Sequence, residues 1–349
     1  MGKALIILVL GVAVAMSFLT MGARERGNDA VSNSCDTFSM AGAGNLAHSA
    51  VNVALNSITS DPSWTSAAQT SSLSGGTCSA SCERVPASVN SRITGVGTYV
   101  QRSHTVQVLV QTRSPNLRSA ITANPPVKTL GTLTVDGRDY DEHGNVIPGQ
   151  GGLAIECSDV IIRGGSSVYG GTNENGGDFV PSTSYDPSIT NENAVFDGGF
   201  PPSPDAAVGL SEGTLKGRAM SGANGSQYTT DPSTLTMPLR GVTYVELPDG
   251  GIWNDATLTG GSNGILVIHS AAKDAVLKNF YGSFCGIVIA DDVDKIHGTI
   301  IGNLTVIGGA ATGNCIGNGE GKVLYSTHFI FDALNGLPKS DLKVLSWWE

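Results

Sequence analysis

Six short apolar pieces decide the fold of the C-terminal part of this chain: GILVIHS (264–270), AVLKNFYG (275–282), CGIVIADD (285–292), VDKIHGTIIG (293–302), NLTVIGGA (303–310) and GKVLYST (321–327). Each is an apolar run bounded by Gly, Asn or Asp, which is typical of short strands. Similar triplets begin at Ile265, Ile287 and Leu304, and this spacing of about 20 residues is the period of a solenoid.

The connections between these pieces are too short for the helices of βαβ units. The pattern therefore predicts a mostly β protein whose head is a right-handed parallel β-helix. Its tight corners would explain the glycine content, because corners require positive φ. We expect seven side chains to point largely inward: Ile265, Val267, Ile287, Ile289, Ile300, Leu304 and Val306.

The composition agrees with a β-rich globular chain. Of 349 residues, 46 are Gly and only 14% are charged, which excludes a coiled coil; 40% are apolar, which excludes wholesale disorder. The net charge of −10 leaves no basic face for phosphates, so we expect no nucleic-acid partner.

Outward from the repeats, the pattern predicts four regions. We assign residues 128–331 to the β-helix domain, with a loop-rich insertion near 164–240, and residues 332–349 to a C-terminal tail. Residues 61–127 are predicted as a Ser/Thr/Gly linker and a half-buried hairpin, because Val96, Thr98 and Val100 alternate with polar residues, as do the valines of 106–110. The hairpin turn is expected near Arg102 and Ser103.

Residues 1–60 are predicted as a membrane or filament helix. Ala4 to Met21 carries no charge and is near the lower length limit for a membrane-spanning helix. A cleaved secretory signal is the alternative, although Met21 and Ala23 form a poor cleavage site. Apolar residues continue at helical spacing to the expected end near Ser57, with a melted or kinked stretch near Gly27; they are Val31, Cys35, Phe38, Leu46, Ala50, Val53, Leu55 and Ile58.

The chain has an even number of cysteines: Cys35, Cys78, Cys82, Cys157, Cys285 and Cys315. Behind an N-terminal export signal, this number favours an oxidising compartment and structural disulfides, whose connectivity stays open. Cys78 and Cys82 lie in a Ser/Gly-rich segment, where a local disulfide could join the two sides of a turn. Inert thiols are the other interpretation, and we predict no metal site because a second ligand pair of similar spacing is missing.

A short Met-Gly-Lys leader and an apolar helix precede the stretch AGAGNLAHSAVNVAL (41–55). These N-terminal residues resemble the minor-pilin-like (PilX-like) proteins of bacterial type IV pilus systems. The match runs over Asn45, Leu46, Ala47, Ser49, Ala50, Val51, Ala54 and Leu55. The stretch 264–327 is similar to the glycine-rich β-helix region of large pilin-like variants, and DGRDYDEHGNVIPGQGG (136–152) looks like the motif that links the two parts.

This resemblance implies a structural, non-enzymatic subunit of the cell surface or of an extracellular filament. It would be anchored in the inner membrane before assembly and would associate through its helix with copies of itself or with other pilin-like subunits. Pilins carry a glutamate at the fifth mature position, whereas cutting after Gly2 here would leave Lys3 first and Ile7 fifth. We therefore expect a membrane-retained or minor component.

Several motifs have part of the spacing of known chemical sites. Gly209–Gly213 and Gly260–Gly264 have GxSxG spacing but lack the strand and helix of a nucleophile elbow. Asp139–Gly144 begins like a calcium loop, but the twelfth position is Gln150, so an Asx-type turn is expected.

The dense titratable segment Ala290–Gly298 favours a solvated corner for Asp291, Asp292 and Asp294. The alternative is a membrane-anchored carbohydrate-active or carbohydrate-binding β-helix protein that uses paired aspartates. A pure adhesin, which would share this fold and differ only in its ligand, is a further alternative, and a surface carbohydrate is a candidate partner. We predict no catalytic, cofactor-binding or metal-ligating residue and no cofactor.

Overall fold

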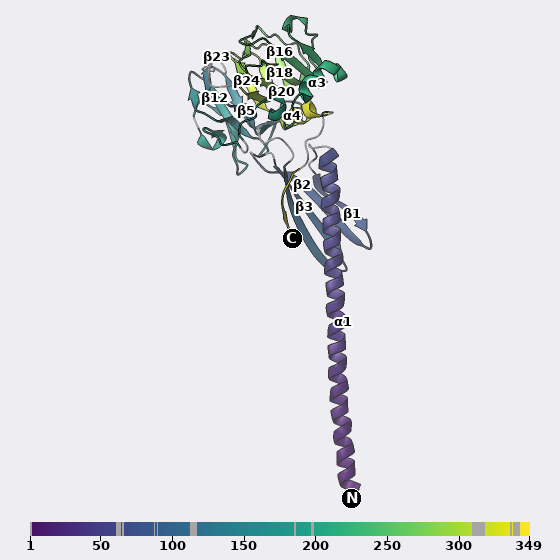
Figure 1. Cartoon of the computed structure of the whole chain (residues 1–349). Coiled ribbons are helices and arrows are strands. Elements are labelled where there is room, and N and C mark those ends of the chain that lie inside the picture. The colour runs from purple at the N-terminus through teal and green to yellow at the C-terminus, as the bar shows by residue number, and fades with distance from the viewer. Residues whose placement is uncertain are drawn as a thin grey trace.

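A computed structural model describes residues 2–60, 64, 66–86, 88, 90–111, 117–184, 186–196, 199–308, 318–335, 337 and 343–349. Figure 1 shows a long helix, α1, with the N-terminus at its far end, an antiparallel sheet against the opposite part of this helix, and a head of short strands beyond the sheet. A long N-terminal helix followed by a mostly β chain, arranged in several sheets, is therefore confirmed.

Helix α1 runs from Gly2 to Ser60 without interruption. The predicted kink near Gly27 is wrong, because one glycine weakens a helix by only about 1 kcal/mol and removes no backbone hydrogen bond. The buried side chains recur every three or four residues on one face: Ser39, Ala43, Leu46, Ala47, Ala50, Val51, Ala54 and Ile58. The predicted stripe is only partly correct, since Val31, Phe38 and Val53 are exposed.

The buried face of α1 packs on an antiparallel sheet of order β1-β2-β3-β4-β25. Its strands are β1 (Ser66–Leu73), β2 (Gly76–Arg84), β3 (Asn90–Tyr99), β4 (Arg102–Gln111) and β25 (Lys343–Trp348). The expected linker thus contains a hairpin, and the expected C-terminal tail supplies an edge strand. The β3–β4 turn is at Val100 and Gln101, which both have positive φ, slightly before the predicted position.

Glycine decides which face of β3 meets the helix. Ile93, Gly95 and Gly97 are buried, and a Cβ atom added at Gly97 would lie 2.1 Å from the carbonyl oxygen of Ala43. Val96 lies on the other face, and Val100 is 65% exposed. The alternation of Val96, Thr98 and Val100 therefore marked the outer face of β3.

The larger sheet of the head is built mainly from parallel strands in the order β13-β12-β7-β24-β22-β20-β18-β16-β15, and β5, β10 and β14 join it beside β22. The strands are β5 (Ser119–Ala123), β7 (Thr134–Asp136), β10 (Leu153–Cys157), β12 (Val168–Thr172), β13 (Asp178–Ser182), β14 (Thr190–Asn191), β15 (Gln227–Thr229), β16 (Val242–Glu246), β18 (Ser262–His269), β20 (Ser283–Ala290), β22 (Thr299–Val306) and β24 (Lys322–Tyr325). Strand β5 thus belongs to the head, although residues 61–127 were assigned to the hairpin region.

Smaller elements complete the head. Two further parallel sheets contain β17 (Ile252–Asn254), β19 (Val276–Lys278) and β21 (Asp292–Val293), and β6 (Val127–Gly131), β11 (Ile161–Arg163) and β23 (Asn318–Gly319). A hairpin joins β8 (Asp139–Tyr140) to β9 (Val146–Ile147), and the helices are α2 (Pro204–Ala207), α3 (Thr214–Ser221), α4 (Thr327–Leu334) and the 3-10 turns Pro187–Ile189, Ala223–Gly225 and Pro232–Thr234. The predicted insertion near 164–240 therefore contains strands of the main sheet as well as helices.

The register of the parallel strands corrects the predicted repeat. Ile265 pairs with Ile287, and Ile287 pairs with Asn303, so the third triplet is displaced by one residue and Leu304 lies opposite Val288. The seven residues expected inside are all buried, but Ile287 and Leu304 lie on opposite faces because side chains alternate along a strand. Side chains on both faces of β20 are buried, and both α2 and α4 contact this strand.

A buried ion pair connects the antiparallel sheet to the head. Arg84 of β2 lies 3.2 Å from Asp139 of β8, and the Asp139 side chain is 1% exposed. Asp139 also accepts a hydrogen bond from the backbone N–H of Thr327, and the guanidinium of Arg84 lies over the ring of Phe331. These contacts hold β2 against α4 and the β8–β9 hairpin.

Candidate functional site

The N-terminal part of α1 carries a long exposed apolar surface. Every described side chain from Ile6 to Met21 is exposed, and Ile7 and Phe18 are each 72% exposed. This helix is long and apolar enough to cross a membrane, and none of its apolar window is buried. The apolar segment of an N-terminal signal sequence meets the same criteria of length and composition. The start of α1 therefore fits either a membrane anchor or a signal sequence.

A second exposed stretch separates this apolar segment from the sheet. It begins with Arg24, Glu25 and Arg26 and continues to Phe38, which is 68% exposed. The helix rises about 1.5 Å per residue, so the stretch places the sheet roughly 25 Å from Met21. Figure 1 shows this part of α1 projecting beyond the sheet. Charged side chains at the end of an apolar segment suit the boundary between hydrocarbon and water.

The head contains a row of titratable residues at the carboxyl ends of parallel strands. Glu246 of β16 pairs with His269 of β18, and Asp291 directly follows Ala290, the partner of Ile268. Asp291 is 0% exposed, so the predicted solvated corner is wrong for this residue. Asp292 is 7% exposed, and only Asp294 is partly exposed, beside Lys278.

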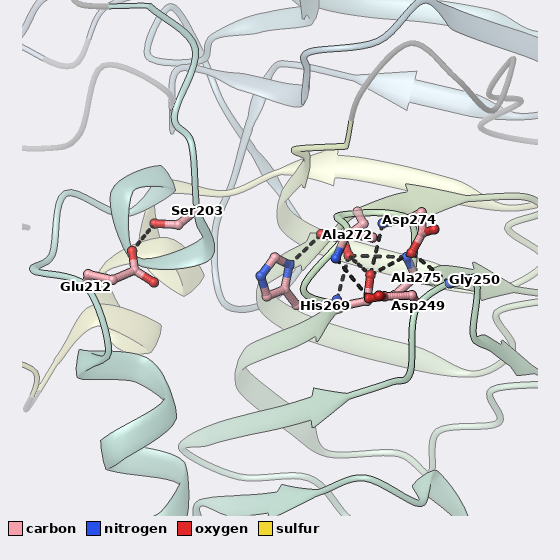
Figure 2. Close-up of polar contacts among 10 residues, drawn as sticks. Ser203, Glu212, Asp249, Gly250, His269, Ala272, Asp274 and Ala275 are labelled. Atoms are coloured by element: carbon pink, nitrogen blue, oxygen red, sulfur yellow. Dashed lines mark hydrogen bonds and ion pairs between the residues drawn. The ribbon is translucent and has the colours of Figure 1, made fainter.

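Several donors satisfy the buried carboxylate of Asp291, and two of the residues that supply them, His269 and Ala275, are labelled in Figure 2. His269 Nδ1 lies 2.6 Å from one oxygen, and the backbone N–H groups of Ser270 and Ala275 donate to the other at 2.7 and 3.2 Å. A buried carboxylate is tolerated when its oxygens are hydrogen-bonded. Asp291 therefore ties the end of β18 to the loop that follows it.

Neighbouring carboxylates have similar roles. Asp274 accepts hydrogen bonds from the Ser270 hydroxyl and from the Gly250 N–H, and these donors hold the pKa of Asp274 below its ordinary value. Asp249 accepts from the N–H of Ala272. These contacts join the loop between β16 and β17 to the loop between β18 and β19. The Ser270 hydroxyl donates to Asp274 rather than to His269, so the cluster does not have the connections of a Ser-His-Asp triad.

Glu246 stands at the other end of the row. It accepts hydrogen bonds from Lys216 at 2.8 Å and from Tyr228 at 2.5 Å, and these donors lower its pKa. A general acid needs the opposite shift. Nearby, Ser203 donates to Glu212, as Figure 2 also shows. The network therefore attaches α3 and β15 to β16.

The remaining motifs have structural partners. Ser262 is 1% exposed; its hydroxyl donates to the Thr259 carbonyl and accepts from the Leu239 N–H. Ser211 lies in an exposed turn before α3. Asp141 accepts from the N–H groups of His143 and Asn145, which confirms the predicted Asx-type turn. Within the described part of the chain, no group of three or more His, Cys, Asp or Glu side chains could hold a metal ion.

The five described cysteines are free thiols. Cys78 and Cys82 both lie in β2, and four residues of extended chain separate their Cα atoms by about 13 Å, too far for a disulfide. The predicted local disulfide is therefore wrong, because the segment is a strand rather than a loop. Burial raises the pKa of the Cys82 thiol to about 11. Cys315 lies outside the described residues.

Sequence reasoning missed the row of Glu246, His269 and Asp291. A signal was present, since all three residues follow the apolar runs of neighbouring strands, whose carboxyl ends meet at one edge of a parallel sheet. Comparison of the chain with protein-family models, with curated proteins and with solved structures found no match.

Proposed function

We propose that this protein is a structural, membrane-anchored pilin-like subunit that displays its head away from the membrane. The observation that carries the proposal is the exposed, uncharged segment of α1, which projects beyond the sheet on which the same helix is seated. Such a surface would aggregate in water, so it requires lipid or other apolar helices around it.

The packed half of α1 supports this proposal. The residues that carry the pilin resemblance include Leu46, Ala47, Ala50, Val51 and Ala54, and all five are buried against the sheet. The helix backbone at Ala47 lies so close to Gly95 and Gly97 of β3 that a Cβ atom on either glycine would collide with it. The matched pattern therefore has a physical purpose here, because it seats a long helix on an antiparallel sheet.

The head supports a display role if its parallel strands are successive turns of a β-helix. Each of β16, β18 and β20 is followed by a strand of a second parallel sheet, namely β17, β19 and β21. We infer a right-handed parallel β-helix from this repetition. Such a rigid stack suits presentation of a surface and needs no enzymatic activity.

The proposed location is the inner membrane before assembly, and the cell surface or an extracellular filament afterwards. Partners would be copies of this chain or other pilin-like subunits that contact α1. Ile7 stands where pilins place a carboxylate, so pairing of that carboxylate with a neighbouring amino terminus is not available to this chain. A minor or membrane-retained subunit fits better than a major one.

Membrane extraction of the full-length protein tests the proposal. The wild type should stay with bacterial membranes after an alkaline carbonate wash. A Leu10→Glu, Val14→Glu double variant should be released, because each charge at the centre of a membrane helix costs about 3 kcal/mol. Val31→Glu, on the exposed stretch outside the apolar segment, is the matched control and should stay bound. Release of the wild type would overturn the proposal.

A further inference from the structure

A groove of about 400 Å³ lies between α4, the residues that directly precede β16, and the first residues of β18. Figure 1 shows α4 beside β18 and β20. The side chains that line the groove include Arg240, Asn224, Asn263, Asn335, Phe329 and Asp332. The volume lies within the range of small-molecule sites, about 300 to 1,000 Å³.

Part of the groove is bare backbone. Gly241 and Gly264 line it, and both have positive φ. A Cβ atom at Gly264 would lie 2.0 Å from the carbonyl oxygen of Gly241, so stacking of the strands requires glycine there. Because Gly241 and Gly264 have no side chains, a ligand can approach their peptide groups closely.

Arg240 gives the groove a positive charge. Its side chain is exposed and makes no hydrogen bond or ion pair with any residue that the structure describes. A guanidinium presents paired N–H donors whose geometry matches a carboxylate. By contrast, Arg84, Arg118 and Arg138 each form an ion pair within the fold. Arg240 is therefore ready to bind an anionic group from outside.

The other side chains favour a ligand with hydroxyl groups. The amides of Asn224, Asn263 and Asn335 make no side-chain hydrogen bond within the described residues, and each offers donors and an acceptor. Phe329 is half-buried and supplies an apolar ring surface. Asp332, which lies 3.3 Å from His328, adds an acceptor for sugar hydroxyl groups.

We propose that this groove binds an acidic saccharide. The sugar carboxylate would meet Arg240, its hydroxyls the amides and Asp332, and the apolar face of a ring would meet Phe329. The site is separate from the row of Glu246, His269 and Asp291. The proposal goes beyond the structural role, and it stands whether or not the chain is anchored in a membrane.

Calorimetric titration of the full-length protein in detergent tests this proposal. The probes are trigalacturonate, the uncharged trisaccharide maltotriose and inorganic phosphate. We expect trigalacturonate to bind best, and Arg240→Gln to weaken its binding at least about tenfold, as expected for loss of a charge-assisted pair of hydrogen bonds. Asn263→Ala should weaken it severalfold.

Arg218→Gln is the matched control, because Arg218 lies on α3 and does not line the groove; its affinity should equal that of the wild type. Both arginine variants should keep the wild-type melting temperature. The proposal is overturned if the wild type does not bind trigalacturonate, if maltotriose or phosphate binds equally well, or if Arg240→Gln retains full affinity.

Discussion

The helix-and-sheet part and the head have separate hydrophobic cores, and the two cores are built differently. The first contains one face of α1 and the inner faces of β2, β3 and β4, from Leu46 to Val110. The second runs from Leu117 to Leu337 and includes whole strands, such as Ile265 to Ile268, that are buried on both faces. A single inner face leaves an alternating pattern in the sequence, whereas burial of both faces leaves a continuous apolar run.

Both parts need glycine, but for different contacts. Gly97 admits the backbone of a helix. Gly264, Gly286 and Gly302 follow one another on neighbouring strands, and all three have positive φ. A Cβ atom added to each would lie only 2.0, 2.0 and 1.9 Å, respectively, from the carbonyl oxygen of a glycine on the chain segment beside it. Glycine thus marks where backbones meet in this protein, rather than where the chain is loose.

Ile287→Asp should have the largest effect, and it should act on the head alone. Ile287 is 0% exposed and lies between Ile265 and Asn303, so the new carboxylate would be buried without a partner. We expect a loss of about 4 kcal/mol in the head's free energy of unfolding. A melting curve followed by far-ultraviolet circular dichroism should show the strand signal of the head lost at a lower temperature than in the wild type, while α1 remains helical.

Val195→Asp is the control for this variant. Val195 is 94% exposed in the same part of the chain, so the same new charge should leave the melting curve unchanged. An unchanged curve for Ile287→Asp as well would mean that Ile287 is not in the core. Simultaneous loss of α1 would show that the two cores are not independent.

Gly97→Val should have the next largest effect, on the other core. The added side chain would meet backbone atoms of Ala43 and Ala47, which cannot move without displacing α1 from the sheet. We expect about 3 kcal/mol of destabilisation, at the upper end for overpacking. Hydrogen exchange should rise at Ala43 to Ile58 and stay unchanged in β18 and β20; Thr94→Val, on the outer face of β3, should change neither.

The smallest expected effect concerns the network at the edge of the head. The pKa of Glu246 is lowered, so its contribution to stability is present above its unfolded pKa, about 4.3, and is lost as the pH falls through its folded value. Glu246→Gln should lower stability by about 0.5 kcal/mol at pH 7 and by less at pH 3, which is below the unfolded pKa of Glu246. Denaturant titrations at both pH values measure this, with the exposed Glu320→Gln as control; equal losses at both pH values would contradict it.

The N-terminal helix and several strands of the head can be predicted from the sequence, because their apolar side chains form recognisable runs. The uncharged run at Ala4 to Met21 and the apolar runs near Ile265 and Ile287 are visible because apolar side chains mark them. The inner face of β3 was missed because Gly95 and Gly97 have no side chain to count. Strand β25 was missed because its partner, β4, is more than 230 residues away and nothing local indicates the pairing.

The candidate site was harder to predict from sequence than the strands. Asp291 follows an apolar run, as a solvated turn residue would, and its burial depends on donors from β18 and the loop after it. Arg240 lies in a polar segment, and only the packing of α4 places it in a groove. Such contacts depend on the register in which neighbouring strands pair. The spacing of about 20 residues between the apolar triplets does not determine that register.

The most direct test of the central proposal is the mass of the mature protein, measured by mass spectrometry after extraction from the producing cells. The proposal predicts that Ala4 to Met21 is retained, so that the N-terminal peptide of the mature chain contains the whole apolar segment and remains with the membrane or the assembled filament. A mature chain that begins after Ala23 would contradict it, because the exported protein would then lack the segment through which it is proposed to be anchored and assembled.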